Sequence, residues 1–317
     1  MEVTLKVKRF NPESESKEPY FQEYNLEVEE YVTVLDALIK VREEVDGSLA
    51  LRCSCRAAIC GSCSMRVNGH AKLVCKTKIT DVAPKDHNVT VEPMGNLPVV
   101  KDLVSDMKPF WDRVRAVQPW LQPEGPEPEE EYIAPGEDML HLTGVMSCIM
   151  CGACASDCTV LEVDRNFLGP AALAKAYRFV GDPRDDADKE RLEKYSQYGG
   201  IWDCTRCMEC VQVCPKGVAP MDRIMSLRDK AMEAGYTNNN GARHTDAFSE
   251  LVKHSGRLDE LRLPMKTFSM FDIQAMVGMI PVALRAVRRG KAPSPFHKPI
   301  PGAEKVRRIF DKAESEK

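Results

Sequence analysis

The chain has 317 residues, 43% of them hydrophobic and 29% charged, and a formal net charge of −4 at pH 7. These values suit a globular protein of about two domains, and the small negative charge gives no reason to expect a nucleic-acid partner. Residues 1–10 lack the apolar core of a signal peptide. The longest apolar run, residues 275–284, is shorter than the about 20 residues that a membrane-spanning helix needs. We therefore expect a chain that does not itself cross a membrane.

The N-terminal third shows the two-residue periodicity of β-strands. Thr33, with Asp36 in capping-box position, predicts the start of a helix that Gly47 ends. Asn68-Gly69 is a strong hairpin signal. Strands are expected at residues 3–7, 24–28, 65–67, 71–74 and 89–91, the final strand lying before Pro93. Two hairpins, one helix and a loop of cysteines indicate a small β-grasp domain over residues 1–105.

The rest of the chain has helical patterns. A helix over residues 108–121, with Phe110, Val114 and Val117 on one face, precedes a Pro- and Glu-rich linker at residues 122–131. Further helices are expected at residues 171–180, 222–234 and, as the one helix of the basic tail, around 272–289, with a turn or flexible loop at 238–241. The predicted fold class is α+β. Its expected parts are residues 1–105, a linker with a helix at 106–137, a helical domain at 138–235 and a basic amphipathic C-terminal extension at 236–317.

Thirteen cysteines are the outstanding feature of the composition. Disulfide frameworks belong mainly to small secreted chains. This chain is large, shows no signal peptide, and clusters its cysteines two to four residues apart. Metal binding is therefore the better interpretation.

The first cysteine set has the spacing C-x4-C-x2-C followed by a distant fourth cysteine, which is the plant-type ferredoxin pattern for a 2Fe–2S cluster. Its predicted ligands are Cys55, Cys60, Cys63 and Cys75. Gly61 and Ser62 are small enough to let backbone N–H groups approach the sulfurs. A structural zinc site is the alternative, although zinc more often uses paired C-x2-C knuckles.

Two further runs each read C-x2-C-x2-C-x3-C, the pattern of bacterial two-cluster ferredoxins. In that pattern the fourth cysteine of each run binds the cluster held by the other run. The predicted ligands of a 4Fe–4S cluster are Cys148, Cys151, Cys154 and Cys214. The predicted ligands of a second 4Fe–4S cluster, or of a 3Fe–4S cluster without Cys207, are Cys158, Cys204, Cys207 and Cys210.

The thirteenth cysteine, Cys53, is expected to be a buried or half-exposed free thiol, with an exchange of roles with Cys55 as the alternative. No catalytic acid–base or nucleophile constellation and no Gly-rich nucleotide loop accompany the clusters, and no C-x-H pair indicates a Rieske centre. The sequence therefore predicts one-electron transfer between partners, with no substrate chemistry on this chain.

These motifs together resemble the iron–sulfur subunit of succinate dehydrogenase and fumarate reductase over about residues 1–235. The matching stretches are Cys55-Arg56, Cys60-Gly61-Ser62-Cys63, Leu168-Gly169-Pro170-Ala171, Ala176-Tyr177-Arg178 and Cys214-Pro215-Lys216-Gly217. The resemblance implies a FAD flavoprotein partner, where succinate and fumarate interconvert. It also implies electron flow through the 2Fe–2S, 4Fe–4S and third clusters towards a membrane-anchor subunit and quinone.

Several positions depart from the family pattern. The position of Cys207 is usually not cysteine in the family, and the third cluster is 3Fe–4S. Because this chain has the fourth thiolate, we expect a second 4Fe–4S cluster. Thr159 stands where the family has proline, residues 159–164 lack the aromatic residues that the family places beside quinone, and Thr205 stands where histidine is common. Ala58 replaces a common glycine in the first loop.

Residues 279–285, 288–291 and 293–298 resemble the tails of heterodisulfide-reductase-like proteins, which work with cysteine-rich CCG-type subunits. This resemblance implies a cysteine-rich CCG-type membrane anchor on a separate chain, with quinone reached only indirectly. The tail has two open interpretations. One is an amphipathic helix that docks on a partner or on anionic lipid through Arg285, Arg288, Arg289 and Lys291. The other is a solvated basic face over an ordinary core stripe of Ile273, Met276, Val277 and Ile280.

The leading functional hypothesis is an electron-transfer subunit of a succinate:quinone oxidoreductase or fumarate reductase. The alternative is a relay in a thiol-linked fumarate or heterodisulfide-type reductase, and a third class is a purely structural zinc or iron protein. The expected location is peripheral to the inner (cytoplasmic) membrane on its cytoplasmic side, with folded export alongside a twin-arginine partner as the alternative.

Overall fold

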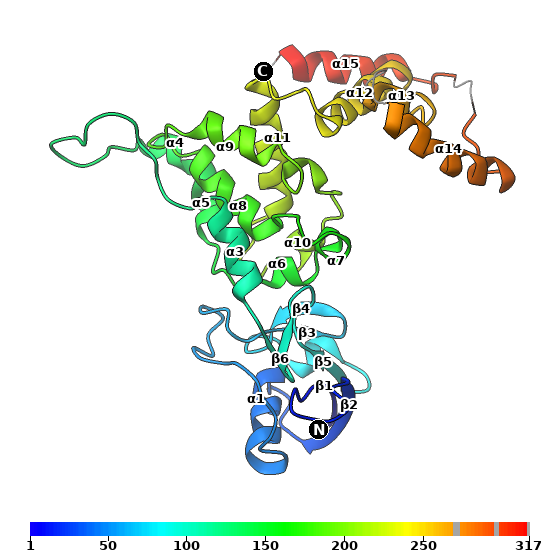
Figure 1. The fold of residues 1–317 in the computed structure, drawn as a ribbon. Helices are drawn as coiled ribbons and strands as arrows, with labels where there is room; N and C mark the ends of the chain where they lie inside the picture. Colours follow the sequence, from blue (N-terminus) through cyan, green and yellow to red (C-terminus); the bar gives the residue numbers. More distant parts are fainter. Residues whose placement is uncertain (269–272, 295–297, 316–317) are drawn as a thin grey trace. The chain divides into compact units, whose positions relative to one another are not determined.

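The computed structural model describes residues 1–268, 273–294 and 298–315 (Figure 1). The chain folds into two compact units, Met1–Lys230 and Ala231–Lys317. The first unit contains a β-sheet, a group of helices and all thirteen cysteines, whereas the second is helical in its described residues. Apart from short helices at residues 34–45 and 79–82, which lie between strands, the helices follow the last strand, and the α+β prediction is confirmed at this level.

The first unit begins with a five-stranded mixed sheet of order β2-β1-β5-β3-β4. Strand β1 (Glu2–Arg9) is antiparallel to β2 (Tyr20–Glu27) and parallel to β5 (Asn88–Glu92). Strand β3 (Ser64–Val67) is antiparallel to both β5 and β4 (His70–Leu73). All five predicted strands are thus confirmed.

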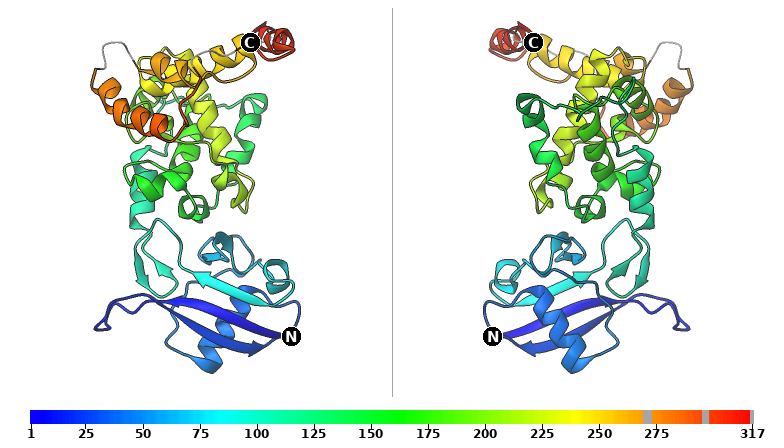
Figure 2. Two further views of the ribbon diagram at one scale, coloured as in Figure 1. Left: turned by 90° about the vertical axis from the view of Figure 1, so that its right-hand side faces the viewer. Right: turned by 90° about the vertical axis from the view of Figure 1, so that its left-hand side faces the viewer.

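Helix α1 (Val34–Lys40) lies across one face of this sheet and continues as a short π-helical turn, η1 (Val41–Val45) (Figure 2). The predicted capping box is present, because the Thr33 hydroxyl accepts from the Asp36 N–H and the Asp36 carboxylate accepts from the Thr33 N–H. Apolar side chains of the helix and of alternate strand positions form one core. The buried members from β1 and α1 are Val3, Leu5, Val7, Val34, Leu35, Ala37, Leu38 and Ile39.

The predicted hairpin between β3 and β4 turns at Asn68 and Gly69, whose φ angles are 50° and 85°. Two consecutive positive φ angles define the hairpin turn that Asn-Gly favours. The prediction that residues 89–91 form the final strand is wrong. Strands β6 (Val99–Lys101) and β7 (Val104–Ser105) follow as a separate two-stranded ribbon, and both are too short to show a periodic pattern.

The remaining elements of the first unit are helices, most of them short. Helix α2 lies between β4 and β5, whereas α8 is almost wholly buried and contacts α3, α5, α6 and α9. The early ones are α2 (Ile79–Val82), α3 (Lys108–Ala116), α4 (Gly136–Met139), η2 (Leu140–Leu142) and α5 (Thr143–Met146). The later ones are α6 (Ala153–Ser156), α7 (Thr159–Val163), α8 (Pro170–Val180), α9 (Asp188–Tyr195), η3 (Ile201–Asp203), α10 (Glu209–Gln212) and α11 (Pro220–Glu233). The predicted helices at residues 171–180 and 222–234 correspond to α8 and α11.

Helix α3 ends at Ala116, several residues before the predicted end at residue 121. Pro119 accounts for the difference, because proline disfavours helical geometry in the residue before it, and Gln118 has a φ of 49°. Phe110, Val114 and Val117 are nonetheless buried together, as predicted.

The second unit contains more helix than the sequence predicted. Helix α12 (Asn240–Ser255) packs against α13 (Arg262–Thr267) and α15 (Ala303–Ser315), while α14 (Ile273–Arg288) matches the predicted tail helix. The prediction of a turn or loop at residues 238–241 is wrong at its C-terminal end, because Asn239 is the N-cap of α12 and accepts from the Ala242 N–H at 2.8 Å. In the described part of the chain, none of the helices combines the length and apolarity needed to cross a bilayer.

A buried cation fixes the segment that follows α3. The Arg191 guanidinium, 1% exposed, pairs with the Asp185 carboxylate at 3.0 Å. It also donates to the backbone carbonyls of Val117, Gln118 and Trp120 at 3.1, 2.8 and 2.7 Å. One side chain from α9 therefore satisfies three backbone carbonyls of an irregular segment, which lacks the regular backbone hydrogen bonds of a helix or sheet.

We expect Arg191→Met to lower the free energy of unfolding by about 3–5 kcal/mol, because it leaves a buried carboxylate and three carbonyls without this partner. Urea unfolding of the anaerobically purified chain, followed by circular dichroism, measures the change. Arg115→Met is the matched control, since its partner Asp112 is 3.5 Å away and its side chain is 70% exposed; a change within about 0.5 kcal/mol is expected there. Equal losses in the two variants would contradict the structural role of Arg191.

Candidate iron–sulfur sites

The first cysteine set lies on the loop between η1 and β3, with Cys75 just after β4. Backbone N–H groups of this loop point at two of its sulfurs. Ala57, Ile59 and Cys60 donate to Cys55 Sγ at 3.3, 3.4 and 3.3 Å, and Ala58 donates to Cys75 Sγ at 3.3 Å. Several donors converging on a sulfur suit a thiolate that carries negative charge.

Positive φ angles make this convergence possible. Arg56, Ala58 and Gly61 have φ angles of 53°, 55° and 73°, a conformation that only glycine adopts without strain. Ala58, which replaces a common glycine, thus keeps the left-handed conformation that glycine would adopt freely. Gly61 and Ser62 were expected to admit the N–H donors. The donors observed are instead residues 57–60, and Ser62 contributes its hydroxyl, 3.1 Å from Cys60 Sγ.

The second predicted set is brought together from two distant stretches of the chain. Cys148, Cys151, Cys154 and Cys214 line one pocket, together with the apolar side chains of Ile149, Ala171, Ala174 and Val218. The Val218 N–H donates to Cys214 Sγ at 3.4 Å. A pocket that carries four thiols and little other polarity suits an iron–sulfur cluster, which needs four sulfur ligands and protection from water.

The third predicted set shows the same mixing of the two runs. Thr159, directly after Cys158, places its hydroxyl 3.5 Å from Cys207 Sγ, and α6 of the first run packs against α10, which contains Cys210. Arg228, which is buried, donates to the carbonyls of Ile201, Trp202 and Cys204 at 2.8, 3.0 and 2.7 Å and so holds the segment that enters this set.

The two runs share one backbone geometry. The residues on each side of Cys151, Met150 and Gly152, have φ angles of 56° and 80°. The residues on each side of Cys207, Arg206 and Met208, have φ angles of 59° and 70°. A helical turn follows in each case, α6 and α10. The repeated C-x2-C-x2-C spacing therefore corresponds to a repeated backbone conformation.

Burial raises the pKa of several of these thiols, because it penalises the charged thiolate. The pKa of Cys63 rises to about 12, that of Cys151 to about 11 and that of Cys210 to about 12, and burial also raises the pKa of Cys154 and Cys158. A hydrogen bond with the Ser62 hydroxyl lowers the pKa of Cys60 to about 6. Bound iron would offset this burial cost, because a metal deprotonates a coordinating thiol.

Among the described residues, no three His, Cys, Asp or Glu side chains are close enough together to share a single metal ion. A cluster makes a different demand, since each iron takes one cysteine thiolate in a 4Fe–4S cluster or two in a 2Fe–2S cluster, and inorganic sulfides supply its other ligands. The N–H donors that converge on the first set and the apolar pocket that gathers the second set fit that demand. Cys53 lies half-buried against the core of the sheet.

The first and second sets are in direct contact through Gly61. A Cβ at this position would lie 2.7 Å from Cys151 Cβ and 2.9 Å from Cys151 Cα. Only a residue without a side chain allows this approach. The first loop and the second run therefore touch backbone to backbone.

A second group of contacts fixes the same two parts of the unit, and the sequence analysis missed it. The Asn96 side-chain amide donates to the carbonyls of Ala155, Ser156 and Cys158 at 2.9, 3.1 and 2.9 Å. The Gly95 N–H donates to the Ser156 hydroxyl at 2.9 Å. We call residues 95–96 and 155–158 the clasp. Gly95-Asn96 reads as a turn in the sequence, but partners about sixty residues away leave no local signal.

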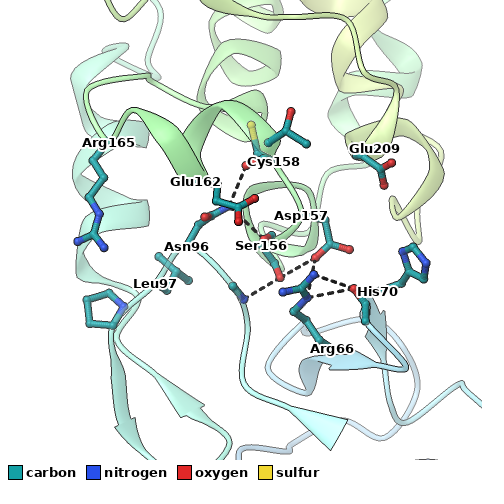
Figure 3. Close-up of a pocket in the computed structure, with 14 residues that line it drawn as sticks. Arg66, His70, Asn96, Leu97, Ser156, Asp157, Cys158, Glu162, Arg165 and Glu209 are labelled. Carbon is teal, nitrogen blue, oxygen red and sulfur yellow. Dashed lines mark hydrogen bonds and ion pairs between the residues drawn. The ribbon is translucent and has the colours of Figure 1, made fainter. Parts of the chain in front are cut away.

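An open pocket lies beside the clasp, and Figure 3 shows Arg66, Ser156 and Asp157 turned towards one another within it. Asp157 accepts from the Ala71 N–H at 2.7 Å and pairs with Arg66 at 3.4 Å. Cys158, Glu162 and Glu209 line the same pocket. The third thiol set thus borders a solvent-filled opening rather than a closed core.

We expect Gly61→Ala to reduce the amount of iron held per chain, because the new Cβ cannot fit against Cys151 and pushes the first loop away from the second run. Iron and labile sulfide per chain, with the thermal midpoint, measure the effect.

Gly69→Ala is the matched control for this variant. Gly69 also has a positive φ, 85°, but nothing lies within 4 Å of a Cβ there. Both variants carry a backbone cost of about 1 kcal/mol, so only the clash differs between them. If both variants keep the same iron content and midpoint, the contact at Gly61 is not the constraint that its geometry indicates.

Comparison with known proteins identifies both cysteine-bearing stretches. Residues 4–112 match a 2Fe-2S iron-sulfur cluster binding domain, and residues 144–218 match a 4Fe-4S dicluster domain. The chain is 39% identical over 228 residues to a fumarate reductase iron-sulfur subunit from Mycobacterium tuberculosis, covering 71% of this chain and 91% of that protein.

Two other relatives are named for succinate dehydrogenase. The chain is 35% identical over 235 residues to a mitochondrial succinate dehydrogenase iron-sulfur subunit of Oryza sativa, covering 73% of this chain and 83% of that protein. Among solved structures, it is similar to a chain of the Mycobacterium smegmatis Sdh1 complex in the apo form, with a TM-score of 0.68, 28% identity and coverage of 74% of this chain and 97% of that chain.

Proposed function

The chain belongs to the family of succinate dehydrogenase and fumarate reductase iron–sulfur subunits, and from this premise we propose the path that electrons take through it. As a member of that family it is an electron-transfer subunit of an oxidoreductase, with 2Fe–2S and 4Fe–4S clusters as cofactors. The proposals that follow concern its ligands, its domains and its partners.

Each cluster is assigned to one thiol set. Cys55, Cys60, Cys63 and Cys75 hold the 2Fe–2S cluster. Cys148, Cys151, Cys154 and Cys214 hold the 4Fe–4S cluster. Cys158, Cys204, Cys207 and Cys210 hold a third cluster, which is a second 4Fe–4S because Cys207 supplies a fourth thiolate.

Bound clusters would carry one electron at a time. The positions of their cysteine ligands in the fold determine the order in which an electron reaches them. The observation that carries the proposal is the continuous adjacency of the three sets. Gly61 of the first loop touches Cys151 of the second set, and Cys154 of the second set interacts with Cys210 of the third. Helix α6, which contains Cys154, also packs against α10, which contains Cys210. An electron that enters at the first set therefore meets the second and then the third without leaving the first unit.

The domain assignment follows the same division. Residues 1–105 form a β-grasp domain of the plant-type ferredoxin class, and residues 138–235 form a helical two-cluster domain of the bacterial ferredoxin class. Residues 106–137 link them, and residues 236–317 form the C-terminal extension. The mixed sheet with α1 on one face supports the first name, and the doubled cysteine run supports the second.

The electron donor is a FAD flavoprotein subunit that docks on the first loop. Cys55 and Cys60 are exposed in this chain, and Ile59 between them is 64% exposed. An apolar side chain exposed beside two cluster ligands suits a surface that a partner covers.

The electron acceptor is a membrane-anchor subunit of the cysteine-rich CCG type, which passes electrons on to quinone. Helix α14 supports this assignment, because Ile273, Val277, Ile280, Leu284 and Val287 recur at the spacing of one helix face and each is more than half exposed. The alternative interpretation, an ordinary core stripe of Ile273, Met276, Val277 and Ile280, is therefore wrong for Ile273, Val277 and Ile280, which are exposed; the side chain of Met276 lies outside the described residues. Arg285, Arg288, Arg289 and Lys291 extend the surface with positive charge. The resulting location is peripheral to the inner membrane, on its cytoplasmic side.

Anaerobic affinity purification of the tagged chain from its own cells tests the relay. We expect flavin and succinate-driven dye reduction to co-purify with the chain, along with iron that approaches ten atoms per chain (two from the first cluster and about four from each of the others). If clusters are present but neither flavin nor succinate activity follows them, the relay to a thiol or disulfide site replaces this proposal. Ile59→Asp should lower the flavin-to-iron ratio, whereas Ile133→Asp, at an 80% exposed position in the linker, should not.

The acceptor proposal has its own test. Val277→Asp with Ile280→Asp places charge on the exposed stripe of α14, and we expect the cysteine-rich subunit to be lost while the flavoprotein and dye reduction remain. Gln274→Asp is the matched control, since it adds a charge to the same helix outside the stripe. These substitutions are sharper than deletion of the tail, because deletion also removes α15, whose Asp311 and Glu314 pair with Lys253 of α12. Full retention of the subunit in the double variant would contradict docking through α14.

A further inference from the structure

The four thiols of the third set differ in exposure. Cys158 and Cys210 are each 7% exposed and Cys204 is half-buried, whereas Cys207 is exposed. Cys207 is also the thiol by which this set exceeds the usual complement of the family. The fourth ligand is therefore the one that packing holds least.

Thr159 contacts this exposed thiol from a distant part of the sequence. Its hydroxyl donates to Cys207 Sγ at 3.5 Å. Thr159 is the first residue of α7, directly after Cys158. Thr159 thus links the end of the first cysteine run to the second cysteine of the other run.

The side chain of Cys207 lies on the open side of the third set. Cys207 is exposed, and Thr159, Glu209 and Cys158 line the open pocket of Figure 3, so water reaches this side of the set. A hydroxyl donor here orders a side chain that would otherwise rotate in solvent.

We propose that Thr159 is a positioning residue for the third cluster, whose hydroxyl holds the Cys207 thiolate in place as the fourth iron ligand. The inference rests on the proposed third cluster with four thiolates. It has two consequences. The hydrogen bond favours the more negative, reduced state, so it raises the midpoint potential. It also slows the loss of the iron at Cys207, because a ligand fixed in position recaptures that iron.

The test compares Thr159→Val and Thr159→Ser with the unaltered chain in its purified complex. EPR-monitored redox titration measures the potential of the third cluster, and the 3Fe–4S signal that grows during timed air exposure measures iron loss. We expect Thr159→Val to lower the equilibrium constant for reduction by severalfold to about tenfold, a tenfold change being about 59 mV for one electron. We also expect its 3Fe–4S signal to grow several times faster. Thr159→Ser, which keeps the hydroxyl, should restore both values.

Thr205→Val is the matched control, because it makes the same change at an exposed threonine beside a ligand without removing the contact to Cys207. If the unaltered chain holds a 4Fe–4S third cluster and Thr159→Val leaves both readouts unchanged, the inference fails while the proposed function stands. If the unaltered chain already shows a stoichiometric 3Fe–4S signal when fully active, the four-thiolate cluster fails and the inference fails with it. Should Thr159→Val not assemble, an unchanged potential and iron loss in Thr159→Ala would overturn the inference equally.

Discussion

The contact between Gly61 and Cys151 is the constraint on which the rest of the first unit depends. Backbone atoms of the two cysteine loops approach so closely that even a methyl group would lie 2.7 Å from the facing Cβ. A small rotation of the sheet region, which carries the first cysteine loop, against the helical region, which carries Cys151, would change this distance. The clasp and the Arg66–Asp157 pair supply the required rigidity, since both bridge residues before and after the linker. The polar contacts at this boundary are therefore best understood as the means of keeping two loops in register.

Left-handed backbone conformations are the second recurring device. They occur on both sides of Cys151 and on both sides of Cys207, and they occur again at Arg56 and Ala58 in the first loop. Most of these residues are not glycine, so the conformation carries a cost of about 1–2 kcal/mol at each. Strain of this kind persists where the surroundings over-determine it, and an iron–sulfur cluster bound by every neighbouring thiolate would be such a surrounding. The metal and the strained loops then stabilise each other.

The sequence predicts well those features that local chemistry determines. The alternation in β1, the capping box at Thr33 and the Asn68-Gly69 turn each depend on residues a few positions apart, and each was confirmed. The mixing of the two cysteine runs remains a prediction, although the pocket that gathers Cys214 with Cys148, Cys151 and Cys154 is consistent with it.

Features that depend on distant partners could not be predicted. The clasp joins Asn96 to carbonyls about sixty residues later, and Arg191 satisfies acceptors more than seventy residues earlier. The ribbon of β6 and β7 is too short to be periodic, and the helices after residue 238 lacked strong signals apart from α14. In each case the tertiary context, rather than local propensity, decides the conformation.

The distribution of exposure along the three thiol sets completes the argument for a relay. The first set exposes Cys55 and Cys60, the middle set exposes none of its thiols fully, and the last set exposes Cys207. A protein that only stores electrons does not need exposed ligands at both the first and the third set. A structural metal site does not need exposed ligands at all. An electron relay between two partners requires exposed ligands at its first and last clusters, because electrons enter and leave where the partners make contact. The middle cluster is best shielded from water and oxygen. On this view Thr159 lies at the exit, where the thiolate that is least protected by packing meets the next protein.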